Sequence, residues 1–172
     1  MKHLKISVSL LLIGFFILNC GNKATEESLR SQAQKLEQEE KYEEALEIYT
    51  KQLENFPEGK FADEALHKIA FINYNNKNAF DKAIENHKRL IHDYPDSRFV
   101  TQARFMIGYI YANDLKDYDQ ARESYTEFLK YHSDNELAES VKWELEHLGQ
   151  DINEQLQHIF SKDKSNGEAK VN

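Results

Sequence analysis

Three segments of the chain repeat at an interval of 38 residues, and this regularity restricts the fold more than any other feature of the sequence. Each segment has an aromatic residue followed three positions later by an alanine. The aromatic residues are Tyr42, Phe80 and Tyr118, and the alanines are Ala45, Ala83 and Ala121. Apolar residues then recur at three- and four-residue steps, which indicates amphipathic helices. A fixed period of this length is typical of stacked helical hairpins.

A second set of helical segments with the same period lies between the first. Phe61, Ala65 and Ile69 correspond to Phe99, Ala103 and Ile107, and then to Leu137, Val141 and Leu145. Short polar stretches separate the two kinds of helix, which predicts antiparallel hairpins. Pro57 and Pro95 should end the second helix of the first hairpin and of the second hairpin, because proline cannot continue a helix. Ser133 and Glu136 have the spacing of a capping box, which predicts a helix that opens there after the third hairpin.

The repeated positions resemble the tetratricopeptide repeat, which has a small residue in its first helix and an aromatic residue at its turn. Ala33, Ala70 and Gly108 take the small position. The resemblance implies an all-α right-handed superhelix of about three helical hairpins plus a C-terminal capping helix. We expect repeats at residues 26–59, 60–97 and 98–133 and a cap at 134–160, together forming a domain over 25–160, and a polar disordered tail at 161–172.

The N-terminus has the layout of a signal peptide. Lys2, His3 and Lys5 precede the apolar stretch Ile6 to Leu18, which has 13 residues and is followed by Asn19 and Cys20. A helix needs roughly 20 apolar residues to cross a bilayer, so this stretch is too short to remain in the membrane. Residues 1–19 are therefore predicted to be removed.

The end of the apolar stretch, Leu18-Asn19-Cys20-Gly21, resembles the lipobox of bacterial lipoproteins. The resemblance implies that Cys20 carries acyl chains and that residues 20–24 form a short tether. Gly21, where some lipoproteins have aspartate, implies the periplasmic face of the outer membrane by the sorting rule of enteric-type bacteria. The alternative is a free cysteine after an ordinary secretory signal.

The 38-residue form of the repeat, with Tyr94-Pro-Asp-Ser97 followed by spaced alanines, resembles the repeats of BamD-type outer-membrane assembly lipoproteins and of CpoB-type proteins associated with the Tol-Pal system. The resemblance implies a non-catalytic scaffold that binds an envelope or outer-membrane protein, in outer-membrane protein assembly or envelope and cell-division coordination. The alternative function is a substrate-binding lipoprotein that captures a peptide or glycan in its concave groove.

Other functions are disfavoured by the charge and the motifs. The formal net charge is −8, and it becomes −10 if Lys2 and Lys5 leave with the signal peptide. Such a surface repels nucleic acid. The sequence has no His-Glu-x-x-His pair, no Gly-x-Ser-x-Gly motif and no second cysteine, so we expect neither a metal site, a cofactor nor catalysis.

A partner-binding groove is predicted from aromatic residues and histidines that recur on the first helices. His67, Phe105 and Trp143 form one column at 38-residue spacing, and Phe71, Tyr109 and His147 form a second column one turn further along. Tyr74 extends the same face. Exposed rings on a concave surface are common anchors for a partner segment. The alternative is that these rings pack hairpin against hairpin.

Overall fold

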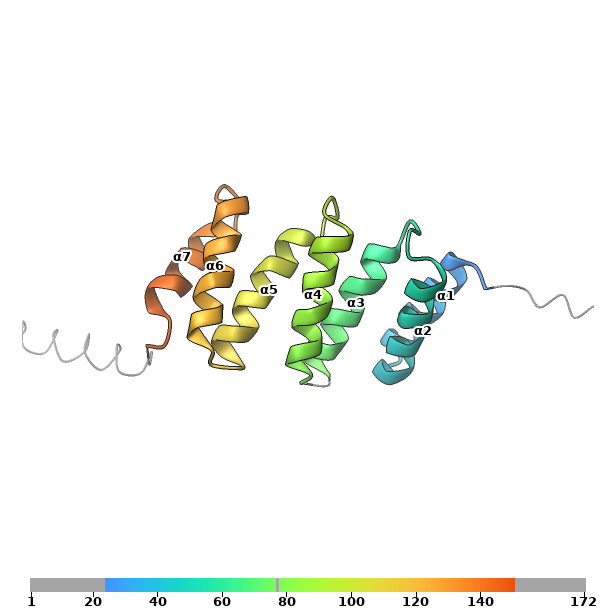
Figure 1. Cartoon of the computed structure of the whole chain (residues 1–172). Helices are drawn as coiled ribbons and strands as arrows, with labels where there is room; N and C mark the ends of the chain where they lie inside the picture. Colours follow the sequence, from blue (N-terminus) through green and yellow to red (C-terminus); the bar gives the residue numbers. More distant parts are fainter. Residues whose placement is uncertain (1–23, 77, 151–172) are drawn as a thin grey trace, which may run out of the picture.

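The computed structural model describes residues 24–76 and 78–150, and all regular structure within them is helical. The helices stand side by side in a row (Figure 1). They are α1 (Glu26–Gln38), α2 (Tyr42–Asn55), α3 (Ala62–Asn75), α4 (Phe80–Asp93), α5 (Val100–Asn113), α6 (Tyr118–His132) and α7 (Ala138–His147). Residues 1–23, which include Cys20, and residues 151–172, which include the end of the predicted cap from residue 151 and the whole predicted tail at 161–172, lie outside the described residues.

Each helix packs chiefly against the helices before and after it in sequence, so the molecule is a linear stack of hairpins. The hairpins are α1–α2, α3–α4 and α5–α6, and α7 packs against α6. The predicted all-α fold of helical repeats is confirmed. In such a stack each hairpin is stabilised only by its neighbours.

The loop inside each hairpin has the same backbone geometry. Glu40, Asn78 and Lys116 have positive φ angles of 57°, 48° and 55°. Each lies two residues before the aromatic residue that begins the second helix. A single residue in this left-handed conformation reverses the chain and lets α2, α4 and α6 return along the helix before them.

The junctions between hairpins also repeat, and they correct one prediction. The N–H groups of Gly59, Ser97 and Asn135 donate to the carbonyl oxygens of residues 56, 94 and 132. Ser133 is consequently the C-cap of α6. Helix α7 begins at Ala138, and its N-cap residue, Leu137, makes no side-chain capping hydrogen bond. The predicted capping box of Ser133 and Glu136 is wrong, because the junction turn common to all three hairpins occupies these residues.

Small residues lie where helices approach most closely. Ala45, Ala83 and Ala121 have no exposed surface. At Gly108 on α5, a Cβ atom would lie 2.5 Å from two ring carbons of Tyr125 on α6, which is itself fully buried. The small residue that the repeat pattern places at position 108 therefore has a direct steric cause.

Gly108→Ala is expected to lower the free energy of unfolding by about 1 to 2 kcal/mol, because overpacking outweighs the gain in helix propensity. The shift in urea midpoint measures the loss. In a Tyr125→His background, which recreates the Ala70 and His87 pair of the middle hairpin, the same change should cost less. An equal cost in both backgrounds would contradict the steric explanation.

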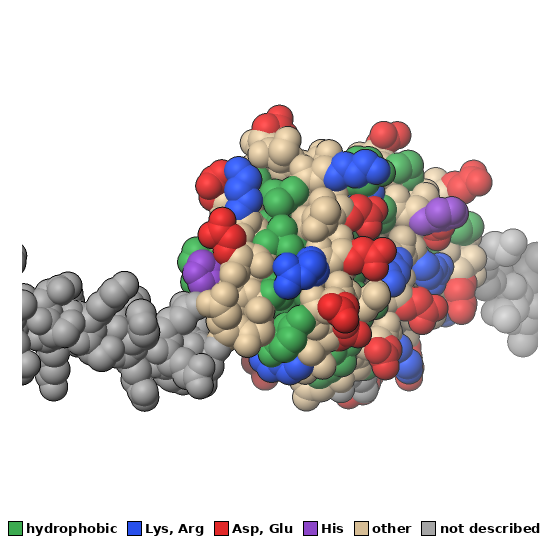
Figure 2. All heavy atoms as spheres, turned by 60° about the vertical axis from the view of Figure 1, so that its left-hand side comes forward, with side chains coloured by type: hydrophobic (Ala, Val, Ile, Leu, Met, Phe, Trp, Pro, Cys, Tyr) green, Lys and Arg blue, Asp and Glu red, His purple; other side chains and the backbone are tan. Residues whose placement is uncertain are grey.

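The surface carries charges of both signs. Figure 2 brings the α7 end of the molecule forward, and on this face acidic and basic side chains are interspersed. Some oppositely charged side chains of the described residues form exposed pairs, such as Lys142 with Glu139 at 2.6 Å. Exposed pairs of this kind contribute little to stability but keep helix faces solvated.

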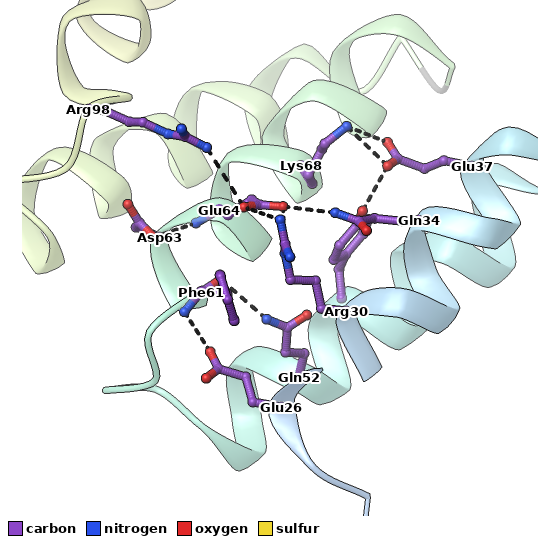
Figure 3. A network of polar contacts seen from close by, with 11 residues as sticks. Glu26, Arg30, Gln34, Glu37, Gln52, Phe61, Asp63, Glu64, Lys68 and Arg98 are labelled. Atoms are coloured by element: carbon purple, nitrogen blue, oxygen red, sulfur yellow. Dashed lines mark hydrogen bonds and ion pairs between the residues drawn. The ribbon is translucent and has the colours of Figure 1, made fainter. Parts of the chain in front are cut away.

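A polar network joins α1 to α3 at the N-terminal end of the stack (Figure 3). Arg30 donates two hydrogen bonds to the carboxylate of Glu64, with distances of 2.9 and 3.0 Å. Gln34 donates to the same carboxylate at 3.1 Å. The paired geometry fixes the orientation of both side chains, as is usual for arginine and carboxylate.

Glu26 supplies a second connection between these helices. Its carboxylate accepts a hydrogen bond from the backbone N–H group of Phe61 at 2.7 Å, just before α3 begins (Figure 3). It also accepts one from the backbone N–H group of Lys60 at 3.0 Å. These N–H groups have no partner within a helix, so Glu26 caps α3 from outside. Gly59 lies beneath, and a Cβ atom there would collide with the Glu26 carboxylate. The first turn of α1 is thus joined to the second hairpin.

Candidate groove between the second and third hairpins

A cavity of about 350 Å³ lies between the second and third hairpins, bordered mainly by their first helices. It brings together five of the seven residues predicted for the groove. They are His67, Phe71 and Tyr74 on α3, and Phe105 and Tyr109 on α5. Asn75, His87, Gln102 and Met106 complete the lining. A cavity of this volume and apolar character is typical of sites that bind small groups.

The aromatic walls of the cavity support one another. The Tyr109 ring lies 6.0 Å from Phe105 and meets Tyr74 edge-on at 6.5 Å, measured between ring centroids. Such contacts hold rings in defined positions. Burial, with Asp114 nearby, raises the pKa of Tyr74 to about 12, so its hydroxyl stays protonated at neutral pH. The walls are therefore formed before any partner arrives.

Phe71 is the wall residue most available to a partner. Its side chain is 45% exposed, whereas the other four predicted residues of the cavity are half-buried. The ammonium group of Lys68 lies 5.9 Å from the centre of the Phe71 ring. Phe71 can consequently lose its ring with little disturbance to the core.

The alternative interpretation, in which the rings pack hairpin against hairpin, describes other contacts of the same residues. Phe105 lies 6.3 Å from Tyr125 and 6.5 Å from Phe128, both in α6. His67 stacks on Phe99 with ring centres 4.3 Å apart. Phe105 and His67 therefore contact the core on one side and border the cavity on the other, and truncating Phe105 would disturb both.

Trp143 and His147 do not line this cavity. Their rings stack on each other at 4.4 Å on α7, and Trp143 is 47% exposed. His147 Nδ1 lies 2.7 Å from the Trp143 carbonyl oxygen. The structure thus places these two predicted residues together, but apart from the other five.

His87 borders the cavity from the second helix of its hairpin. It occupies the repeat position of Tyr49 and Tyr125 and is 2% exposed, so it faces the core as they do. Its contribution to a cavity was not predicted. The signal in the sequence was the size difference, since an imidazole fills less space than the phenol ring that the other two hairpins have at this position.

Two other features, a metal-binding cluster and a membrane-spanning helix, are not found in the described part of the chain. Within residues 24–76 and 78–150, no group of three or more His, Cys, Asp or Glu residues could hold a metal ion. No helix in the same part of the chain is long and apolar enough to cross a membrane.

Comparison with known proteins identifies the family. No curated protein matches the chain. The family model YfiO, described as outer membrane lipoprotein, matches residues 22–149. This match supports the resemblance to BamD-like envelope lipoproteins with tetratricopeptide repeats. Because it covers more than half of the chain and includes every hairpin described above, the protein belongs to the YfiO family of outer membrane lipoproteins.

Proposed function

We propose that this protein is a non-catalytic scaffold of the cell envelope, which holds another envelope protein through the cavity between α3 and α5. The observation that carries the proposal is the convergence of five rings from two successive hairpins on one apolar space, four of them at equivalent positions of the repeat. A partner segment that inserts a side chain there would lose much of the water around that side chain, as residues at binding hot spots do.

The attachment to the membrane is part of the same proposal. Cys20 is acylated after cleavage of residues 1–19, and the protein faces the periplasm from the outer membrane. Membership of an outer membrane lipoprotein family supports this assignment. Only Gly21 to Ala24 separate Cys20 from the N-cap Thr25, so the tether is short and the hairpins stay near the lipid surface.

Phe71→Ala is expected to weaken partner binding about 30-fold, the effect of removing a hot-spot side chain of about 2 kcal/mol. Full-length lipoprotein would be purified from detergent-solubilised envelopes, and the co-purifying proteins would be quantified. Tyr131→Ala is the matched control, because Tyr131 is also an exposed aromatic residue, at 54%, but lies on α6 away from the cavity.

Equal loss of the partner in both variants, or no loss in either, would contradict a role for the cavity.

Stoichiometry separates the two classes of function. A scaffold co-purifies with its partner in a fixed ratio, whereas a protein that captures and releases a peptide or glycan does not. A fixed ratio that survives Phe71→Ala would indicate a scaffold that uses another surface.

A further inference from the structure

The ring of Trp143 is more exposed than its counterpart in the preceding hairpin. Phe105, 38 residues earlier, is half-buried and lies 6.3 Å from Tyr125 and 6.5 Å from Phe128, both in the second helix of its own hairpin. Trp143 is 47% exposed, and His147 of the same helix stacks on it. Helix α7 ends the described row (Figure 1), so the described residues include no second helix that could cover Trp143 in the same way.

The chain turns back immediately after α7. Gly149 has a φ of 77°, and the N–H of Gln150 donates to the carbonyl oxygen of His147 at 3.0 Å. With Leu148 at a φ of −54° and a ψ of 122°, this is a type II β-turn, which reverses the chain. The Tyr118 ring at the start of α6 lies 3.2 Å from where a Gly149 Cβ atom would be. The turn is therefore packed against α6, and it directs the following residues back along α7.

The sequence after the turn has an apolar face that needs a surface to cover. Ile152, Leu156, Ile159 and Phe160 recur at the steps of one helix face, and the residues between them are polar. These residues lie outside the described part of the chain. An amphipathic helix gains most of its stability from packing its apolar face, so the segment needs a partner close to its start.

The pairing of α5 with α6 predicts which residue of this segment meets Trp143. Antiparallel helices bring together residues at similar distances from the turn that joins them. Phe105 lies eight residues before the end of α5, and its contact Tyr125 lies seven residues after the start of α6. Trp143 lies four residues before the end of α7. With Ile152 as the first residue of the returning helix, the position four residues further on is Leu156.

We propose that residues 152–160 of this chain cover Trp143 as the second helix of a fourth hairpin, with Leu156 against the indole ring and Ile159 one turn further along. The surface at Trp143 and His147 is then an internal contact of the fold and not part of the partner groove. This inference does not depend on the proposed function, because the cavity between α3 and α5 is lined by neither residue.

The fluorescence of Trp143 tests the contact, because the sequence has no other tryptophan. In the full chain in detergent, Leu156→Asp is expected to shift the emission to longer wavelength and to increase quenching by acrylamide, since a carboxylate loses hydration against an apolar ring. Gln157→Asp is the matched control. It adds the same charge one residue away, outside the apolar face, and should leave emission and quenching unchanged. Circular dichroism would check that helices α1 to α6 are retained in both variants.

A double-mutant cycle measures the size of the contact and replaces the fluorescence test if Leu156→Asp does not fold. It combines Trp143→Ala with Leu156→Ala, because residues in contact have coupled effects on stability. The rise in the equilibrium constant of unfolding should be at least about 2-fold smaller in the double variant than the product of the two single rises.

Several results would overturn the inference. They are unchanged emission and quenching in Leu156→Asp, an equal change in Gln157→Asp, and independent effects in the cycle. Emission of the unmodified protein that depends on protein concentration would show that a second copy covers Trp143 instead. Quenching that falls only when the envelope partner is added would show that the partner covers it. The proposed function fails separately, because it depends on loss of the partner in Phe71→Ala.

Discussion

Cys20→Ala is expected to release the protein from the membrane completely. A single acyl chain binds a bilayer only weakly and reversibly, with a constant of about 10⁴ M⁻¹, whereas two or more chains anchor a protein stably. Loss of Cys20 removes every chain, because the sequence has no second cysteine. Cells labelled with a fatty-acid analogue and then fractionated would show the unmodified protein labelled in membranes and the variant unlabelled in the soluble fraction.

Asn19→Ala is the matched control for this experiment. It changes the neighbouring residue to one of the small residues usual at that place in a lipobox and leaves Cys20 intact. This variant should keep both its label and its membrane position. Label on Cys20→Ala would exclude the predicted lipidation site. Absence of label from the unmodified protein would favour the alternative of a free cysteine after an ordinary signal.

His87→Tyr is expected to remove part of the acid sensitivity of the fold. The pKa of His87 is lowered from 6.5 to about 4 in the folded state, first by burial and then by the charge of His67. Between these two values the unfolded chain binds a proton that the folded chain does not, so the free energy of unfolding falls as the pH falls. The full effect is on the order of 3 kcal/mol.

Urea midpoints at pH 7, 5.5 and 4.5 would measure this effect. Tyrosine is the natural replacement, because Tyr49 and Tyr125 occupy the same repeat position with no exposed surface. As the pH falls, the free energy of unfolding should decrease less in the His87→Tyr variant than in the unmodified protein. His92→Tyr is the control for the substitution itself, since the His92 side chain is 88% exposed. If the free energy of unfolding had the same pH dependence in the variant and the unmodified protein, the pKa of His87 would be the same in the folded and unfolded states.

The hairpins could be predicted from the sequence because their information is local. Tyr42, Phe80 and Tyr118 begin their helices as expected, and the chain ends α2 and α4 two residues before Pro57 and Pro95. The start of α7 was not predicted correctly. The capping-box rule uses only residues 133 and 136, whereas the turn that forms there continues the junction geometry of the two earlier hairpins.

The groove was only partly predictable, because a cavity depends on what stands behind the residues that face it. Behind the α3–α5 rings stands His87, which leaves space. The equivalent residue of the next hairpin is Tyr125, which contacts Phe105 and comes within 2.5 Å of a Cβ at position 108. Spacing along the first helices placed Trp143 and His147 in the same columns as the other five residues. It carried no information about the size of the side chain on the second helix.

The Glu26 and Arg30 contacts with the start of α3 have a mechanical consequence if the proposed anchor is correct. If the chain is held at Cys20 as proposed, any pull between membrane and partner enters the hairpins at the first turn of α1. That turn is bonded directly to Lys60 and Phe61. Tension therefore passes across to the second hairpin, where the proposed cavity begins, without first travelling through α2. Under the proposed anchoring, these bonds would resist peeling of α1 from the stack and so protect the hairpins that border the proposed cavity.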